Sequence, residues 1–220
     1  MKENKTSIVV VLDKSGSMDS CKQDTIGGFN SYIKEQSDVE GQEADLTLIQ
    51  FSNTCDVTFN DLVIQDVAGL DDRNYMPGGG TALYDAIGMG IELMDEKLSG
   101  SEEDEKPAKT LIVIITDGGE NASRKFNQAK IDSLINERKK DDWEFVFIGA
   151  NQDAIKSGGD IGVCRAASLT YDQTRKGTRD AYMSLSSSTR SFRKAKRCSP
   201  SGEKIGFAFG ESDRDKQDVD

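Results

Sequence analysis

The chain has 220 residues, and its 39 Asp and Glu outnumber its 28 Lys and Arg, so the formal net charge is −11. This negative charge opposes general binding to nucleic acid or to an anionic membrane surface. The longest apolar runs, residues 8–12 and 111–115, are much shorter than the ~18 residues that a membrane span requires. Asp13 also interrupts the first run before a secretory signal could form. We therefore expect a cytoplasmic protein with no nucleic-acid or membrane partner.

The first part of the chain alternates strand-like and helical patterns. Residues 7–12 are apolar in the middle, which predicts a central strand buried on both faces. A helix is expected over residues 24–36, followed by strands at 44–52 and 56–60. The link between these two strands is too short for a parallel crossover, so it predicts an antiparallel hairpin at the edge of the sheet.

The same alternation continues to the end of the chain. Pro77 and the glycines after it exclude regular structure up to Gly80, and a helix is expected from Thr81. The remaining expected elements are a buried strand that ends at Asp117, a helix at 125–139, a strand at 143–153, a weak strand at 166–170 and a helix at 172–196. This order predicts a three-layer α/β fold: a mostly parallel sheet with one antiparallel edge strand and helices on both faces. We expect one domain over residues 1–198 and a flexible tail over 199–220.

Oxygen-bearing side chains cluster where the predicted strands end. Asp13, Ser15 and Ser17 follow the first strand, Asp117 follows the second buried strand, and Thr81 follows the glycine-rich segment. Because the carboxyl ends of parallel strands meet at one edge of a sheet, these loops can converge. Two carboxylates and three hydroxyls then form an oxygen site suited to Mg²⁺.

Other residue types restrict the chemistry further. The sequence has no histidine, which removes the commonest transition-metal ligand and the usual general base. The four cysteines form no C-x-x-C pair, so we interpret them as free thiols. Asn151 and Asp153 follow a strand but are interpreted as helix caps, and the basic run 190–197 is interpreted as structural, at a helix C-terminus. Trp143 is expected to be a core anchor or a lid.

The motifs D-K-S-G-S at residues 13–17, G-G-G-T-A-L at 78–83 and I-T-D-G-G at 115–119 resemble the metal-ion-dependent adhesion site of the von Willebrand factor A (vWA) domain. The resemblance covers roughly residues 6–170 and is of the stand-alone bacterial or phage type. It implies a vWA fold, similar to the Rossmann fold, in which Ser15 and Ser17 ligate the metal and Thr81 does so directly or through water. It also implies that Asp13 and Asp117 act largely through water and hydrogen bonds.

The resemblance further implies a function in protein recognition and not catalysis. One metal position stays open for an Asp or Glu of a partner protein, and the metal is Mg²⁺, with Mn²⁺ or Ca²⁺ as substitutes. Two alternatives remain. One is a phosphohydrolase of the haloacid-dehalogenase type with Asp13 as nucleophile, although Ser15 stands where its general acid would be. The other is a scaffold whose metal only rigidifies the loops.

Overall fold

The computed structural model describes residues 1–150, 154–196, 205–210 and 213, and it contains a six-stranded sheet in the order β3-β2-β1-β4-β5-β6. The strands are β1 (Lys2–Asp13), β2 (Glu43–Phe51), β3 (Cys55–Val63), β4 (Pro107–Thr116), β5 (Trp143–Ala150) and β6 (Ser168–Tyr171). All neighbouring strands are parallel except β2 and β3, which pair antiparallel at one edge. The predicted sheet and its edge hairpin are therefore confirmed.

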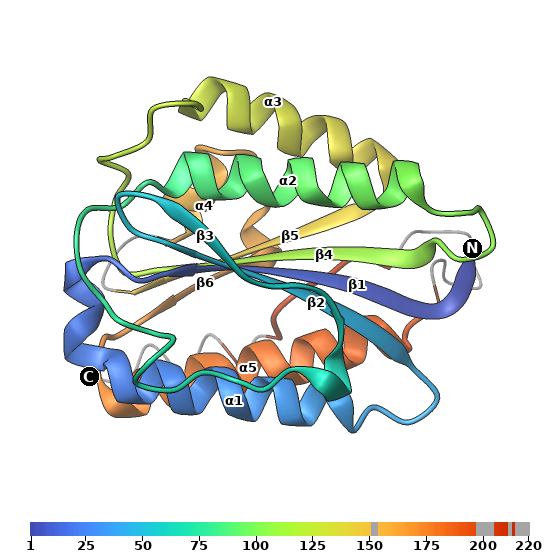
Figure 1. The fold of residues 1–220 in the computed structure, drawn as a ribbon, viewed down its shortest axis with the longest axis horizontal. Coiled ribbons are helices and arrows are strands. Elements are labelled where there is room, and N and C mark those ends of the chain that lie inside the picture. Colours follow the sequence, from blue (N-terminus) through green and yellow to red (C-terminus); the bar gives the residue numbers. More distant parts are fainter. Residues whose placement is uncertain (151–153, 197–204, 211–212, 214–220) are drawn as a thin grey trace.

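Helices cover both faces of the sheet (Figure 1). On one face α1 (Lys22–Ser37) lies beside α5 (Arg175–Lys194), and on the other α2 (Leu83–Gly100) lies beside α3 (Gln128–Arg138). The short α4 (Ala154–Gly159) contacts β5 and β6. Short 3₁₀ helices are η1 (Gly16–Cys21), η2 (Ile64–Asp66), η3 (Lys139–Asp141) and η4 (Arg165–Ala167). Within the described residues, each helix is too short or too polar to cross a bilayer.

The core lies on both sides of the two central strands. Every residue of β4 is buried, and β1 is buried from Thr6 to its end at Asp13. This burial explains why their sequences are continuous apolar runs without alternation. Trp143 is also buried at the start of β5, so it is a core residue and not a lid. Figure 1 shows the carboxyl ends of β1 and β4 together at the edge opposite the N-terminus.

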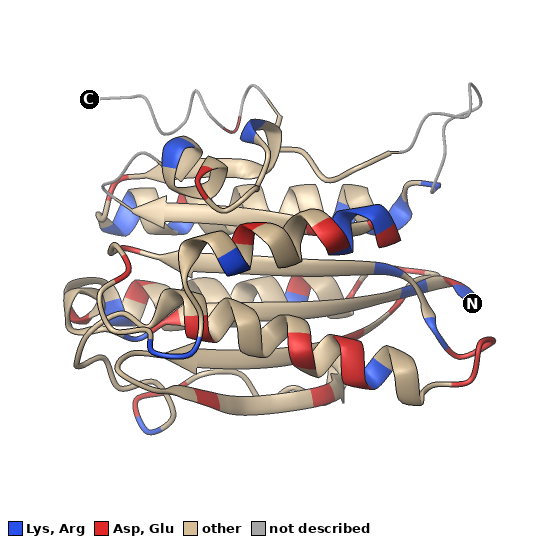
Figure 2. Cartoon of the chain, turned by 90° about the horizontal axis from the view of Figure 1, so that it is seen from above, with Lys and Arg blue, Asp and Glu red and all other residues tan. Residues whose placement is uncertain are grey.

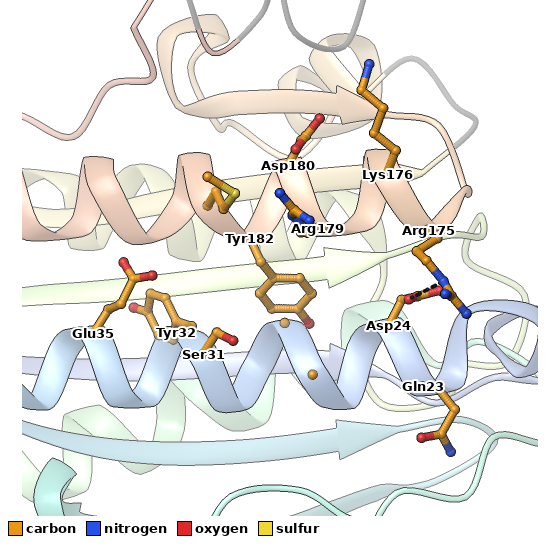
Figure 3. Close-up of a pocket in the computed structure, with 13 residues that line it drawn as sticks. Gln23, Asp24, Ser31, Tyr32, Glu35, Arg175, Lys176, Arg179, Asp180 and Tyr182 are labelled. Carbon is orange, nitrogen blue, oxygen red and sulfur yellow. Dashed lines mark ion pairs between the residues drawn. The ribbon is translucent and has the colours of Figure 1, made fainter.

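A glycine of α1 makes room for a tyrosine ring of α5 where the two helices pack. A methyl group on Gly28 would lie 2.2 Å from Cδ2 of Tyr182, so only a residue without a Cβ lets the ring sit against α1. Figure 3 shows Tyr182 projecting from α5 toward α1, with the Asp24–Arg175 ion pair at one end of the same groove. The groove has a volume of about 820 Å³. A methyl group on the neighbouring Gly27 would have no atom within 4 Å.

The basic residues near the end of α5 have structural contacts, as the sequence predicts. Arg193 is buried and its Nη1 donates to the carbonyl oxygen of Gln36 at 2.5 Å. Arg190 forms an ion pair with Glu35 at 3.3 Å. The carbonyls at the helix end are bound by Lys109 of β4, whose Nζ donates to Phe192 O at 2.5 Å. Arg197 lies outside the described residues, as do Asn151 and Asp153.

Residues 205–210 differ from the flexible tail that the sequence suggests. Phe207 and Phe209 are only 3% and 4% exposed, and their rings contact each other at 5.2 Å between centroids. Phe207 also packs against Phe192 of α5, and Phe209 N donates to the carbonyl of Ala166. Burial of the two apolar rings against the domain thus stabilises this segment. The polar residues around them gave no sign of this packing in the sequence.

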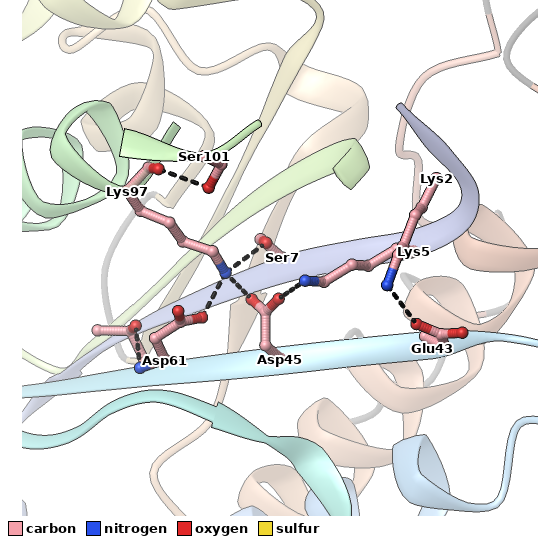
Figure 4. A network of polar contacts seen from close by, with 9 residues as sticks. Lys2, Lys5, Ser7, Glu43, Asp45, Asp61, Lys97 and Ser101 are labelled. Carbon is pink, nitrogen blue, oxygen red and sulfur yellow. Dashed lines mark hydrogen bonds and ion pairs between the residues drawn. The ribbon is translucent and has the colours of Figure 1, made fainter. Parts of the chain in front are cut away.

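A lysine-centred network joins four elements at the far end of the sheet (Figure 4). Lys97 of α2 forms ion pairs with Asp45 of β2, at 2.5 Å, and with Asp61 of β3. Its Nζ also donates to Ser7 of β1 at 2.9 Å. The ammonium group of Lys97 thus has three partners from three strands, so we interpret the network as structural.

Figure 2 marks the charged positions on the ribbon. Both signs occur along the helices, and the acidic loop 102–105 lies near the N-terminus. Of the cysteines, Cys21, Cys55 and Cys164 are free thiols, as predicted, and Cys198 lies outside the described residues.

Candidate metal centre

Asp13 ends β1 and is 0% exposed. Its Oδ1 accepts the backbone N–H of Ser15 at 2.6 Å, and its Oδ2 accepts the hydroxyl of Thr116 at 2.6 Å. Burial raises the pKa of Asp13, and the hydrogen bonds from Thr116 and Ser15 oppose that rise. Both carboxylate oxygens are therefore held by the protein, so Asp13 orients the loop that follows it.

This arrangement also bears on the phosphohydrolase alternative. A nucleophilic carboxylate needs an oxygen that can reach a substrate phosphorus. Asp13 is 0% exposed, and each of its two oxygens already accepts a hydrogen bond from the protein. The geometry therefore disfavours Asp13 as a nucleophile.

The two serines lead from the buried aspartate to the surface. Ser15 is 2% exposed, and its Oγ lies 3.1 Å from Oγ of Ser17. Ser17 is exposed, and its hydroxyl donates to Oδ1 of Asp117 at 2.6 Å. The loops after β1 and β4, which are distant in sequence, thus meet at the Ser17–Asp117 hydrogen bond, as the parallel sheet predicts.

Thr81 is also at this edge, but it is not the first residue of a helix. The helix α2 begins at Leu83, two residues later than expected. The backbone N–H of Thr81 instead donates to Oδ1 of Asn121 at 2.8 Å, and that of Ala82 donates to the carbonyl of Ser52. These bonds to neighbouring loops hold Thr81 outside the helix and leave it 3% exposed.

The hydroxyls of Thr81 and Ser17 border one space beside Gly118. A Cβ built on Gly118 would lie 3.4 Å from Oγ1 of Thr81 and 3.9 Å from Oγ of Ser17. Because glycine has no side chain, this space stays open between the two hydroxyls. The structure thus brings all five predicted residues to one edge, with Asp13 below the hydroxyls and Asp117 beside them.

The glycine-rich loop is tied directly to the loop over residues 13–17. Gly16 N donates to Gly79 O at 3.0 Å, and Gly78 N donates to the carbonyl of Lys14 at 2.8 Å. Gly79 has a φ of +86°, a conformation that other residues rarely adopt. The hydroxyl of Tyr75 donates to the carbonyl of Asp13 at 2.7 Å. These bonds hold Thr81's loop against the Asp13 loop.

Sequence reasoning missed several supporting residues, namely Thr116, Asn121, Tyr75, Gln173 and Asn53, whose Oδ1 accepts the N–H of Gly80 at 2.8 Å. Thr116 is next to Asp117 in the I-T-D-G-G motif, so the sequence could have predicted that it lies close to the site. Gln173 lies far along the chain, on the loop between β6 and α5, yet its Nε2 donates to Oδ2 of Asp117 at 2.6 Å. An isolated glutamine between two elements carries no sequence signal of this kind.

The donor set fits a hard divalent cation. The five candidate ligand residues offer only oxygen atoms in their side chains, and Mg²⁺ and Mn²⁺ prefer oxygen ligands. No three Asp, Glu or Cys side chains gather anywhere in the described part of the chain. A cation at this edge would therefore depend on the hydroxyls of Ser15, Ser17 and Thr81 as well as on carboxylates.

Comparison with protein families settles the class of this domain. Residues 7–178 match the von Willebrand factor type A domain family. The chain belongs to this family. vWA domains are known for metal-dependent adhesion and protein interaction through the metal-ion-dependent adhesion site, and they are generally not enzymes. A comparison with curated protein sequences finds no match.

Solved structures show the same fold at low sequence identity. The vWF domain of the pilus tip protein Mfa5 from Porphyromonas gingivalis is 9% identical with a TM-score of 0.61, over 90% of this chain and 99% of that one. Proximal thread matrix protein 1 from the mussel byssus, solved with a zinc-occupied MIDAS motif, is 19% identical with a TM-score of 0.59. That match covers 83% of this chain and 47% of the mussel protein, so this vWA domain spans about half its length. The PilB minor pilin from Streptococcus sanguinis is 12% identical with a TM-score of 0.56, over 86% of this chain and 62% of that one.

Proposed function

We propose that this vWA domain binds Mg²⁺, or Mn²⁺ in its place, and uses it to hold an Asp or Glu side chain of a partner protein. The hydroxyls of Ser15, Ser17 and Thr81 would be the direct ligands, with Thr81 acting directly or through water. Asp13 and Asp117 would act through hydrogen bonds and water. The bound ion supplies positive charge at a position left open for the partner's carboxylate.

One observation carries the proposal: Ser17 is an exposed residue, and its Oγ lies within hydrogen-bond distance of both Ser15 and Asp117. A hydroxyl in this position can donate its proton to Asp117 while its lone pairs face a cation. Because the three proposed direct ligands are neutral, they leave the ion only partly neutralised. Such an ion attracts a carboxylate even though the formal net charge of the protein is −11, since most of that charge is screened beyond about 8 Å at physiological salt.

We also propose that the protein is located in the cytoplasm. The thiols of Cys21, Cys55 and Cys164 are unpaired, as is usual for proteins in a reducing compartment.

The experiment that tests this function is a pull-down from the native host in Mg²⁺, in Mn²⁺ and in EDTA. We expect a partner that the unmodified domain retains only with a divalent ion, because the contact is made through that ion. A bait carrying Ser15→Ala and Ser17→Ala should not retain it. Replacing the partner's metal-facing Asp or Glu by Ala should weaken binding as much as EDTA does. Equal retention in EDTA would place the recognition surface elsewhere and leave the metal with a structural role only.

A further inference from the structure

Gln173 has a fixed position on the loop that leads into α5. The next residue, Thr174, caps the helix, because its side chain accepts the N–H of Gly177 at 3.0 Å. A Cβ on Gly177 would lie 2.2 Å from the carbonyl oxygen of Asp172, so the turn closes tightly around this glycine. The backbone of Gln173 is therefore held between a strand end and a helix cap.

The side chain of Gln173 links two loops of the metal centre. Its Nε2 donates to Oδ2 of Asp117 at 2.6 Å and to the carbonyl oxygen of Ser17 at 3.1 Å. An amide nitrogen has two hydrogens, which these two oxygens and the more distant sulfur of Cys21 share. The Sγ of Cys21 lies at 3.5 Å from the same nitrogen. The amide therefore bridges η1 and the loop after β4.

Asp117 is consequently held from two sides. Ser17 donates to its Oδ1 at 2.6 Å and Gln173 to its Oδ2 at 2.6 Å, so both carboxylate oxygens have a protein donor. The carboxylate plane is fixed relative to the Ser17 hydroxyl, which is one of the proposed metal ligands. An amide also carries no charge, so Asp117 keeps its full negative charge for a nearby cation.

The far end of α5 is anchored as well. Gln36 of α1 donates to the carbonyl of Ser186 at 3.0 Å, and Arg193 donates to the carbonyl of Gln36. Tyr182 packs against Gly28 between these contacts and the helix N-terminus. Because α5 is held along its length, the amide of Gln173 meets Asp117 from a rigid support.

We propose that Gln173 is a positioning residue of the metal centre, which orders Asp117 and Ser17 before the ion binds. The inference rests on the proposed metal-binding function and adds a fourth loop, from β6 to α5, to the three that carry the D-K-S-G-S, G-G-G-T-A-L and I-T-D-G-G motifs. Hydrogen-bond partners of metal-site residues typically change metal affinity by about 10–100-fold when they are replaced.

The test is calorimetric titration with MgCl₂ and MnCl₂, together with thermal unfolding of the metal-free protein. In Gln173→Met the side chain keeps its length and loses its donor, so we expect a dissociation constant about 10–100-fold higher than that of the unmodified protein. The matched control is Gln23→Met on α1, because Gln23 Nε2 also donates to a carboxylate, Oδ1 of Asp72, at 2.8 Å. The control should bind metal with unchanged affinity.

A second variant, Gln173→Lys, separates positioning from simple loop stability. Lysine retains a donor for Asp117 and anchors the loop by an ion pair, so the metal-free protein should unfold near the temperature of the unmodified protein. The positive charge of the lysine offsets the negative charge of Asp117 and repels the metal ion. We therefore expect metal affinity to fall by at least as much as in Gln173→Met. Unchanged affinity in Gln173→Met, while the unmodified protein binds metal, would overturn the role of Gln173 alone, whatever the lysine variant does, because a cation beside the site repels the metal by itself. If the unmodified protein binds neither ion, the proposed function and this inference both fail.

Discussion

The variant with Ser15→Ala and Ser17→Ala should show no saturable Mg²⁺ binding by calorimetry. It removes two of the three hydroxyls proposed to contact the ion, and both come from one loop. The loss should be selective for metal, because the Oγ atoms of these serines lie 3.1 Å apart and are removed together. Removing both partners of a hydrogen bond costs little stability, and the Oδ1 of Asp117, which loses the Ser17 donor, is only half-buried and can accept a hydrogen bond from water. The free energy of unfolding without metal should therefore stay within about 1 kcal/mol of the unmodified value.

Ser20→Ala is the control for this variant. Ser20 is exposed and lies in η1, the 3₁₀ helix that also contains Ser17. Its hydroxyl donates to the backbone carbonyl of Ser17 at 3.3 Å. It should bind Mg²⁺ normally. If the double variant instead binds with unmodified affinity, the hydroxyls are not ligands and the site assignment is wrong.

Gly28→Ala should be strongly destabilising although alanine is the better helix former. The new methyl group would lie 2.2 Å from Cδ2 of Tyr182, and that ring is buried between α1, α5 and the sheet. Overpacking of this kind typically costs about 1–3 kcal/mol, because the ring cannot move without displacing its neighbours. Urea denaturation of the metal-free protein measures the change.

Gly27→Ala provides an internal comparison in the same helix. A Cβ at Gly27 has no neighbour within 4 Å, so only the gain in helix propensity remains. We expect this variant to be more stable than the unmodified protein by about 0.5–1 kcal/mol. Similar effects of the two substitutions would contradict the packing described for α1 and α5.

Much of the fold could be predicted because its central strands are buried on both faces. The runs at residues 8–12 and 111–115 are apolar throughout, and such runs are typical of central parallel strands. The short link between β2 and β3 was enough to predict the antiparallel edge. The five residues of the proposed metal site could be predicted to converge because they follow strands or loops at one edge of such a sheet.

Other features depend on contacts between distant segments and left no local pattern. β1 begins at Lys2, five residues earlier than expected, because its polar first residues pair with Pro107 of β4 and Glu43 of β2. α3 begins at Gln128 and not at residue 125, since the backbone N–H groups of residues 124–126 donate to Asp85. Phe207 and Gln173 likewise find their partners far away in the sequence. Local periodicity cannot report such pairings.

The most direct test of the central claim is a crystal structure of the protein grown with Mn²⁺, with anomalous diffraction measured to locate the ion. The account predicts one strong anomalous peak at the edge of the sheet, in contact with the hydroxyl oxygens of Ser15 and Ser17 and beside Thr81 and Asp117. Asp13 should stay bonded to Thr116 below it. A peak held by other residues, or none at saturating Mn²⁺, would contradict the assignment of this edge as a metal centre.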